Sequence, residues 1–197
     1  TKSYINSSTV LNDAINAMSK NSNALVFAGN TDLTGLTQAN LDNIKNSNIS
    51  IIEWNNTYNM TETEHLTIIN LATKSGSMLT ENPDQWRSLQ DDLYYQTNNN
   101  ILVNLDKNIW SDSNSLTGVR ENELLHTILK DFTYETGKNV LVISATSDIS
   151  TIDIKDGVRY LTLNGLSTND PDNLNNYTYL KLRVNEDNFR YQLCDLY

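Results

Sequence analysis

The sequence has a single cysteine, two histidines, few basic residues and no long apolar run. Because Cys194 is alone, it cannot form an internal disulfide. No apolar stretch approaches the roughly 20 residues that a membrane-crossing helix needs, and no signal peptide stands out. Lys and Arg number 14 against 24 Asp and Glu, so the formal net charge is −10. That charge repels polyanions, which argues against nucleic acid and anionic membranes as partners.

The length and apolar content that are present fit one globular domain. The chain has 197 residues, of which 38% are hydrophobic, enough for a single core. The sequence begins at Thr1 rather than at methionine and ends at Tyr197 just after a strand-like segment. We therefore expect one domain, 1–197, excised from a longer protein.

Helical and extended patterns alternate over the first three-quarters of the chain. Apolar residues recur at helical spacing in 10–18, in 37–44, after Asn82-Pro83 and in 120–136, with Gly137 as a stop for the last. The third of these helices should bury Trp86, Leu89, Leu93 and Tyr94, and the fourth Leu124, Leu125, Ile128, Leu129 and Phe132. Short buried-type strands are expected at 24–28, 49–53, 66–71, 101–105 and 140–143.

The last quarter of the chain has a different period. Residues 152–154, 158–163, 177–184 and 189–193 alternate, and Asp156-Gly157 is a hairpin turn signal between the first two. The sequence thus predicts a layered α/β domain with a parallel-rich sheet that is completed by carboxyl-terminal antiparallel hairpins.

Loops that follow parallel strands are where such folds place function. Four loops qualify, and each is rich in Asn, Asp or small hydroxyl residues. They are 29–32, 54–56, 106–108 and 145–148.

The order and spacing of these loops resemble the calcineurin-like metallophosphoesterases over most of the chain. The segment 69–93 contains a Gln85-Trp86 pair similar to one in that family, and 121–137 resembles the helix before its last metal loop. Residues 156–160, DGVRY, are similar to a strand of secreted and surface members from Gram-positive bacteria. The resemblance implies a layered αββα sandwich.

The resemblance also implies a two-metal site, and the loops depart from it one after another. Asn30 stands where the family has a metal-bridging Asp, and Asn56 where it has a His. Asp106 replaces a lone His, and 145–148 lacks both histidines of the last loop. A bridging ligand must be a charged oxygen donor, and an amide is far weaker. The family's first strand, with its Asp-x-His, is expected to precede Thr1.

We therefore expect a vestigial cleft with no catalytic residue and no metal. Its residues would be Asn30, Asp32, Asn55, Asn56, Asp106 and Asp148. The other candidate groups have simpler readings: His65 as a solvated turn residue, His126 as half-exposed helix packing, and Asp91-Asp92 and Glu121/Glu123 as solvated helix faces.

Three functions remain open on these residues. The first is a non-catalytic metallophosphoesterase-like domain with a structural or binding role in a bacterial surface protein, extracellular or at the cell surface. Its partners would be other domains of that protein or cell-wall components. The second is an active metal-dependent phosphodiesterase in which Asp32, Asn55, Asp106 and Asp148 offer oxygen ligands to one Mg²⁺, Mn²⁺ or Ca²⁺.

The third function is carbohydrate binding. Trp54 and Trp110 are the main stacking candidates, and Tyr58, Tyr94 and Tyr95 could add faces beside amide-rich loops. The simpler reading of the two tryptophans is that they close loop ends over the sheet.

Overall fold

A computed structural model of the protein describes residues 24–29, 38, 42, 49–54, 57–73, 75–105, 109, 120–146, 150–164 and 178–195. The chain divides into two units. One consists of Thr1–Asn55, Gly165–Tyr179 and Cys194–Tyr197, and the other of Asn56–Asn164 and Leu180–Leu193.

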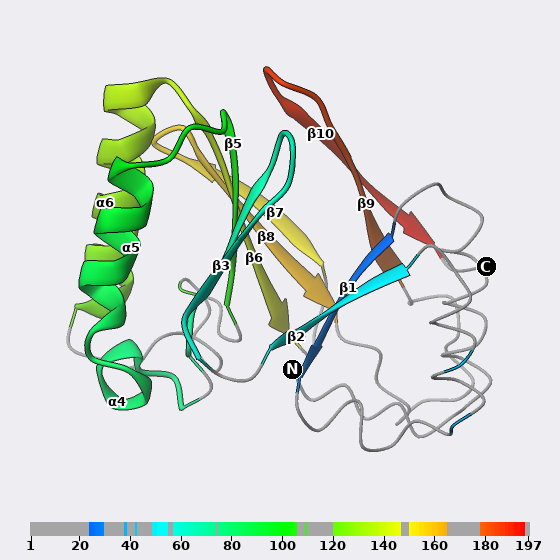
Figure 1. Ribbon diagram of the computed structural model, residues 1–197, viewed down its shortest axis with the longest axis horizontal. Coiled ribbons are helices and arrows are strands. Elements are labelled where there is room, and N and C mark those ends of the chain that lie inside the picture. The colour runs from blue at the N-terminus through cyan, green and yellow to red at the C-terminus, as the bar shows by residue number, and fades with distance from the viewer. Residues whose placement is uncertain are drawn as a thin grey trace. The chain divides into compact units, whose positions relative to one another are not determined.

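The second unit is built on a six-stranded sheet in the order β3-β4-β5-β6-β8-β7 (Figure 1). Its strands are β3 (Asn59–Glu62), β4 (Thr67–Asn70), β5 (Asn100–Asn104), β6 (Asn139–Thr146), β7 (Thr151–Lys155) and β8 (Val158–Asn164). The four central strands, β4, β5, β6 and β8, run parallel, whereas β3 and β7 are antiparallel strands at the two ends. The expected α/β class with a parallel-rich sheet is confirmed.

Two helices lie side by side on one face of this sheet, as Figure 1 shows. They are α5 (Gln85–Tyr94) and α6 (Glu121–Thr136), and a short helix, α4 (Met78–Glu81), precedes α5. Each long helix connects two neighbouring parallel strands, which is the usual crossover of α/β folds.

The core lies between these helices and the sheet. Alternate residues of the parallel strands face the helices, because successive strand side chains point to opposite faces. The buried cluster includes Ile69, Leu71, Leu89, Leu93, Ile101, Val103, Leu105, Leu125, Leu129, Phe132, Val140, Val142, Val158 and Tyr160. Burial of these apolar side chains supplies most of the driving force for folding.

The opposite face of the sheet is buried as well. Ile68, Leu102, Leu141 and Leu161 are at most 1% exposed. Burial on both faces explains why β4, β5 and β6 read as continuous apolar runs. The strands β9 (Thr178–Val184) and β10 (Phe189–Asp195) form a separate two-stranded hairpin. Phe189 of this hairpin is buried, and the Arg159 guanidinium lies 5.9 Å from the centre of its ring.

Several predicted boundaries hold and others shift. Helix α6 ends at Thr136, and the Gly137 that follows it has a φ of 69°, the left-handed conformation expected there. Asp156 and Gly157, with φ of 49° and 84°, form the predicted two-residue turn between β7 and β8. The helix start at Asn82-Pro83 is wrong, because Asn82 ends α4 and α5 begins only at Gln85.

Two residues expected in the core are exposed. Tyr94 is 81% exposed, because the buried stripe of α5 runs through Gln85, Leu89 and Leu93 and leaves Tyr94 beyond its edge. Leu124 is 47% exposed for the same reason on α6. Strand β3 was not predicted, since NMTE has no apolar alternation. Strand β8 also differs from expectation, because it pairs parallel to β6 as well as antiparallel to β7.

In the first unit, β1 (Ala24–Gly29) and β2 (Ile49–Trp54) pair in parallel, which agrees with the strands predicted at 24–28 and 49–53. The stripe at 10–18 falls outside the described residues, and of the helix expected at 37–44 only positions 38 and 42 are described, both helical. Among the described helices, none is long and apolar enough to cross a membrane.

Candidate functional site

The carboxyl ends of β4 and β5 carry an asparagine ladder, formed by Asn59, Asn70 and Asn104. These three residues are direct neighbours in the register of β3, β4 and β5. The Asn104 side-chain amide donates to Asn70 Oδ1 at 3.0 Å, and the Asn70 amide donates to Asn59 Oδ1 at 2.7 Å. Asn70 is fully buried and Asn104 nearly so.

The ladder lies at the carboxyl ends of the parallel strands β4 and β5, where α/β folds usually bind ligands. Its members are neutral amides, and two side-chain hydrogen bonds join them in order across the three strands. These side chains thus link neighbouring strands of the sheet. The repeated pattern of an apolar run closed by Asn, TIIN and NILVN, is the sequence signal that could have revealed the ladder.

The loop after β4 is held by Gln85 of α5. The Gln85 side chain accepts a hydrogen bond from Ala72 N at 2.9 Å and donates to Ala72 O at 2.9 Å and to Met78 O at 2.8 Å. Gln85 is completely buried. The residue that carries part of the family resemblance therefore acts as a structural support for this loop.

Glu121 supports the same loop from α6. One of its carboxyl oxygens accepts from Met78 N at 2.9 Å, and the other accepts from Leu79 N at 3.0 Å and from the Ser77 hydroxyl at 3.1 Å. The side chain thus caps the first turn of α4, where backbone N–H groups lack helical partners. The prediction of a solvated Glu121 is wrong, because the residue is only 1% exposed. Its partners lie 42 to 44 positions earlier, beyond the reach of a local pattern.

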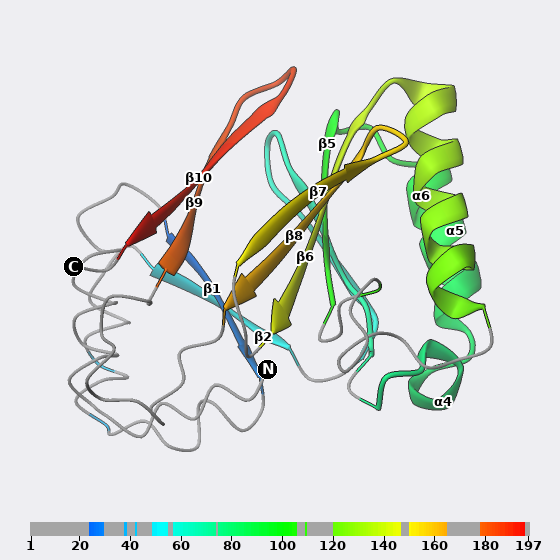
Figure 2. The ribbon, with the colours of Figure 1, turned by 180° about the vertical axis from the view of Figure 1, so that it is seen from behind.

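His126 links α6 to the β7–β8 turn, which reaches toward this helix in Figure 2. His126 Nδ1 lies 2.6 Å from the Tyr160 hydroxyl, and its Nε2 lies 3.0 Å from Asp156 Oδ2. The prediction of half-exposed packing is wrong, since His126 is 7% exposed. The carboxylate that it contacts comes from tertiary structure and not from sequence spacing.

The Asp156–His126–Tyr160 chain resembles a proton relay in its residue types, but the burial of Tyr160 in the core favours a structural role. Burial raises the pKa of the Tyr160 phenol, and the nearby Asp156 charge raises it further. The hydrogen bond from His126 lowers the pKa of Asp156. The Tyr160 ring belongs to the core and is 5% exposed, so it offers little surface to a substrate.

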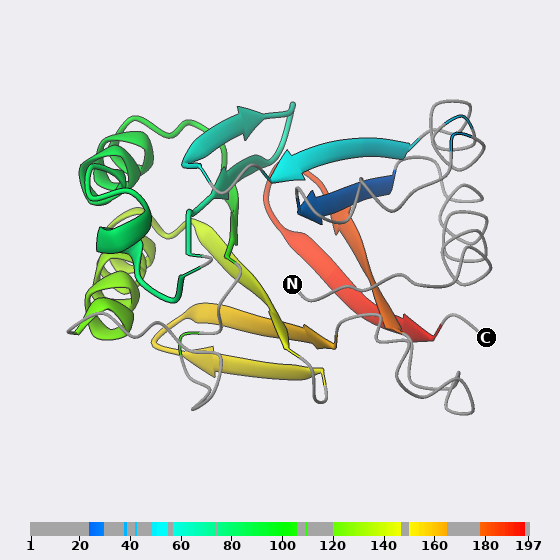
Figure 3. The same ribbon diagram turned by 90° about the horizontal axis from the view of Figure 1, so that it is seen from below.

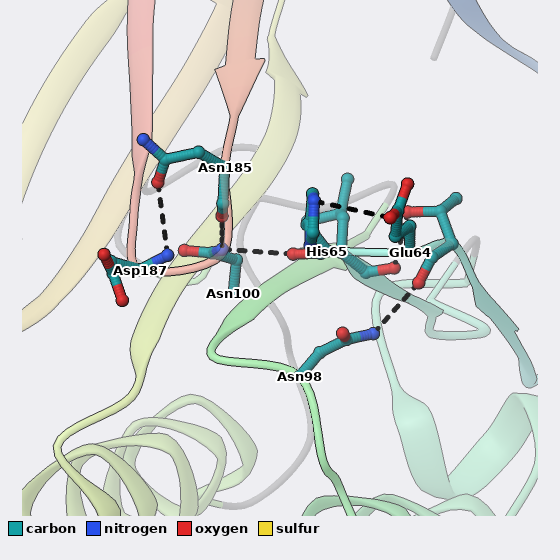
Figure 4. Close-up of polar contacts among 8 residues, drawn as sticks. Glu64, His65, Asn98, Asn100, Asn185 and Asp187 are labelled. Atoms are coloured by element: carbon teal, nitrogen blue, oxygen red, sulfur yellow. Dashed lines mark hydrogen bonds and ion pairs between the residues drawn. The ribbon is translucent and has the colours of Figure 1, made fainter.

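The tip of the β9–β10 hairpin lies at the amino ends of β5 and β6, the end of the sheet opposite the asparagine ladder (Figure 4). The Asn100 amide donates to Asn185 O at 2.7 Å and to His65 O at 3.0 Å. The Asn99 amide donates to Glu186 O at 3.1 Å, and the Asn139 amide to Asp187 O at 2.8 Å. Three consecutive hairpin carbonyls are thus bound by side-chain amides, and we name Asn99, Asn100 and Asn139 the amide clamp.

His65 lies in the turn between β3 and β4, as predicted, and its Nε2 is 3.9 Å from a Glu64 carboxylate oxygen. Its side chain is 39% exposed. Of the acidic pair on α5, Asp91 is exposed as expected, whereas Asp92 accepts a 2.5 Å hydrogen bond from the Tyr58 hydroxyl. Burial, followed by this contact with Asp92, raises the pKa of Tyr58.

Two exposed tyrosines lie at the carboxyl end of α5, Tyr94 as its last residue and Tyr95 as its cap. Tyr94 and Tyr95 are 81% and 76% exposed. Their ring centres are 5.0 Å apart with the planes at 90°, an edge-to-face pair. Tyr58, by contrast, packs against the core cluster, so it offers little stacking surface.

The residues of the predicted vestigial cleft lie outside the described part of the chain. This holds for Asn30, Asp32, Asn55, Asn56, Asp106 and Asp148, and also for Trp110. Trp54 is the last residue of β2, and its side chain is likewise outside the description. Within the described residues, no three His, Cys, Asp or Glu side chains gather into a group that could hold a metal ion.

No protein-family model matches the chain, and no curated protein matches it significantly. Among solved structures, it is similar to GAP50, the anchor in the inner membrane complex of Plasmodium, at 16% sequence identity and a TM-score of 0.36. The match covers 56% of this chain and 37% of that one. The chain therefore spans little more than a third of the relative it matches.

Proposed function

We propose that this chain is a non-catalytic, metallophosphoesterase-like α/β domain with a structural or binding role in a bacterial surface protein. The observation that supports the proposal is the asparagine ladder, because its bonded amides lie at the carboxyl ends of β4 and β5, where α/β folds usually bind ligands. The αββα arrangement and the extracellular location are parts of the same proposal. Other domains of the parent protein or cell-wall components would be its partners.

The buried ionisable groups of the second unit support the same conclusion. Glu121 accepts three hydrogen bonds from the start of α4, and His126 bonds to Tyr160 and Asp156. Groups of these types serve as acids, bases or ligands when a cleft presents them to substrate. Here Glu121 joins α6 to the start of α4, and His126 joins α6 to the β7–β8 hairpin. Contacts of this kind stabilise the fold.

Metal analysis combined with hydrolysis of a chromogenic phosphodiester tests this proposal. The purified protein, incubated in turn with Mg²⁺, Mn²⁺ and Ca²⁺, should hydrolyse the ester no faster than buffer does and should retain no stoichiometric metal after dialysis. Retained metal, with hydrolysis that is lost in Asp32→Ala and kept in Asp84→Ala, would instead establish the active phosphodiesterase that uses oxygen ligands.

The exposed tyrosine pair favours carbohydrate binding as a second candidate function. Tyr94 and Tyr95 offer two rings at right angles on the solvent side of α5, and tyrosine suits wet, amphipathic contacts of this kind. On a glycan array that includes cell-wall fragments, Tyr94→Ala and Trp110→Ala should each reduce binding. Tyr134→Ala is the matched control, since Tyr134 is 89% exposed on α6. Equal binding by all three variants and the wild-type protein would reject this candidate function.

A further inference from the structure

Strand β7 lies at one end of the six-stranded sheet. It is the last strand in the sheet order, and Figure 3 shows it at the edge beyond β8. All five of its residues, Thr151–Lys155, are exposed. Among the described residues, its strand partner is β8 alone. An exposed edge of this kind is a template for pairing with another strand.

The turn fixes which backbone groups face outward. Lys155 and Val158 flank the two-residue turn, so they form a hydrogen-bonded pair, and the pairs alternate from there. Asp153 and Tyr160 are therefore hydrogen-bonded, whereas Ile154 and Arg159 are not. It follows that the N–H and C=O groups of Ile152 and Ile154 point away from β8.

The side chains of β7 divide by chemistry between its two faces. Ile152 and Ile154 share one face and are 44% and 68% exposed, which is unusual for β-branched apolar residues. Asp153 and Lys155 share the other face, two positions apart and of opposite charge. Lys155 already lies within the field of Asp156, whose pKa it helps to lower.

This pattern is complementary to itself. If two copies of β7 pair antiparallel with Ile154 on the two-fold axis, Asp153 of each copy lies opposite Lys155 of the other. The outward groups of Ile154 then form a reciprocal hydrogen-bonded pair, and the charged pairs occupy the closer, non-hydrogen-bonded positions. Centring the pair on Asp153 would instead oppose two like charges.

We propose that β7 is a homodimerisation strand, which pairs antiparallel with β7 of a second copy in this register. The partner is a second copy because the same five residues provide the charges, the apolar face and the outward backbone groups on both sides, as an isologous contact requires. A contact of one short strand is small, so the dimer should be weak and concentration-dependent.

Sedimentation velocity of the full chain tests the proposal, over concentrations from about 1 µM to about 1 mM, the range expected for a weak interface. The wild type should shift from monomer to dimer. Asp153→Lys and Lys155→Asp should each weaken dimerisation at least tenfold. Each variant places two pairs of like charges opposite each other, one on either side of the two-fold axis. Circular dichroism should show that both variants remain folded.

Mixing the two variants gives the decisive measurement. In an equimolar mixture every opposed pair becomes Lys against Asp, so a heterodimer of wild-type affinity should form. The double variant Asp153→Lys/Lys155→Asp should also dimerise like the wild type. A wild type that stays monomeric throughout, single variants that dimerise normally, or a mixture that stays monomeric would overturn the proposal.

Discussion

Glu121 shows how a single buried side chain can organise a distant segment. Its two carboxyl oxygens bind the Ser77 hydroxyl and the backbone of Met78 and Leu79, at the start of a helix of only four residues. A helix this short gains little from its own hydrogen bonds, since nucleation is unfavourable. The cap therefore helps to hold α4 against the core, together with the buried Met78 side chain and the Gln85 bond to Met78 O.

Replacing Glu121 should destabilise the protein strongly. Glu121→Ala leaves the buried Met78 N–H without an acceptor and should lower the free energy of unfolding by about 2–4 kcal/mol. Glu121→Gln keeps one acceptor oxygen and should have a smaller effect. Urea unfolding measures both. Glu123→Ala, at an exposed position of the same helical turn, should stay within about 0.5 kcal/mol of the wild type. A mild Glu121→Ala variant would contradict the role of the cap.

Asp156 makes the stability of the second unit depend on pH in the acid range. Because the His126 hydrogen bond lowers its pKa below the ordinary value of 3.8, the unfolded state takes up this proton more readily than the folded state. The contribution to stability is complete above pH 3.8 and is lost as the pH falls through the lower, folded-state pKa. Asp156→Asn should therefore flatten the acid limb of stability against pH, measured by urea midpoints. Asp131→Asn on α6 is the control, and equal slopes would contradict the expectation.

At the scale of elements, the amide clamp joins the β9–β10 hairpin to the sheet. Its donors come from the start of β5 and of β6, and its acceptors are main-chain carbonyls, so the contact depends on the conformation of the hairpin tip rather than on its side chains. The Asn185 side chain stabilises that tip by accepting from Asp187 N and Asn188 N.

Asn100→Asp should release the hairpin. The change preserves shape but replaces a buried donor to two carbonyls with an acceptor that faces them, which should cost about 2–4 kcal/mol. Hydrogen exchange should then increase at 180–193 before it increases in β5. Asn99→Asp tests the importance of burial, because Asn99 makes a similar contact in an exposed position and its loss should matter less. Similar exchange in both variants would contradict this ranking.

Substitution of two glycines allows the cost of backbone strain to be measured apart from the cost of steric crowding. Gly137 and Gly157 both have positive φ, but a Cβ added at Gly137 meets no atom within 4 Å, whereas one at Gly157 would lie 3.3 Å from Thr133 Cγ2. Gly137→Ala should therefore cost about 1–2 kcal/mol through strain alone. Gly157→Ala should cost more, because the turn must also move away from α6. Thermal unfolding compares the two, and a less stable Gly137→Ala would show that contact at the turn is unimportant.

At the scale of the whole molecule, the proposed loss of catalysis predicts indifference to metals. A ligand that binds the native state raises its stability by mass action. Millimolar Mg²⁺, Mn²⁺ or Ca²⁺, and removal of divalent ions with EDTA, should each leave the melting temperature unchanged. A rise with one cation that disappears in Asp32→Ala would indicate that the altered oxygen-ligand site binds a metal.

The strands and long helices could be read from the sequence because their signals are local. The apolar runs in β4, β5 and β6, the stripe of α6, Gly137 and the Asp156-Gly157 turn each lie within one segment. They formed as expected apart from shifts at the ends and the exposure of Leu124. The Asn82-Pro83 pair predicted the start of α5 less well, because Asn82 closes α4 and α5 begins three residues later, at Gln85.

The composition and these local patterns determined the α/β class, the parallel strands β4, β5 and β6, and the acidic net charge, whereas the parallel pairing of β8 with β6 was not foreseen. Only the tertiary structure decided what the polar residues do. Asn70 meets Asn104 across 34 positions, Glu121 meets Met78 across 43, and His126 meets Asp156 across 30. No local period encodes these distances. A buried polar group must find a partner wherever the fold places one, and that requirement assigned Glu121 and His126, which looked solvated or half-exposed, to the interior.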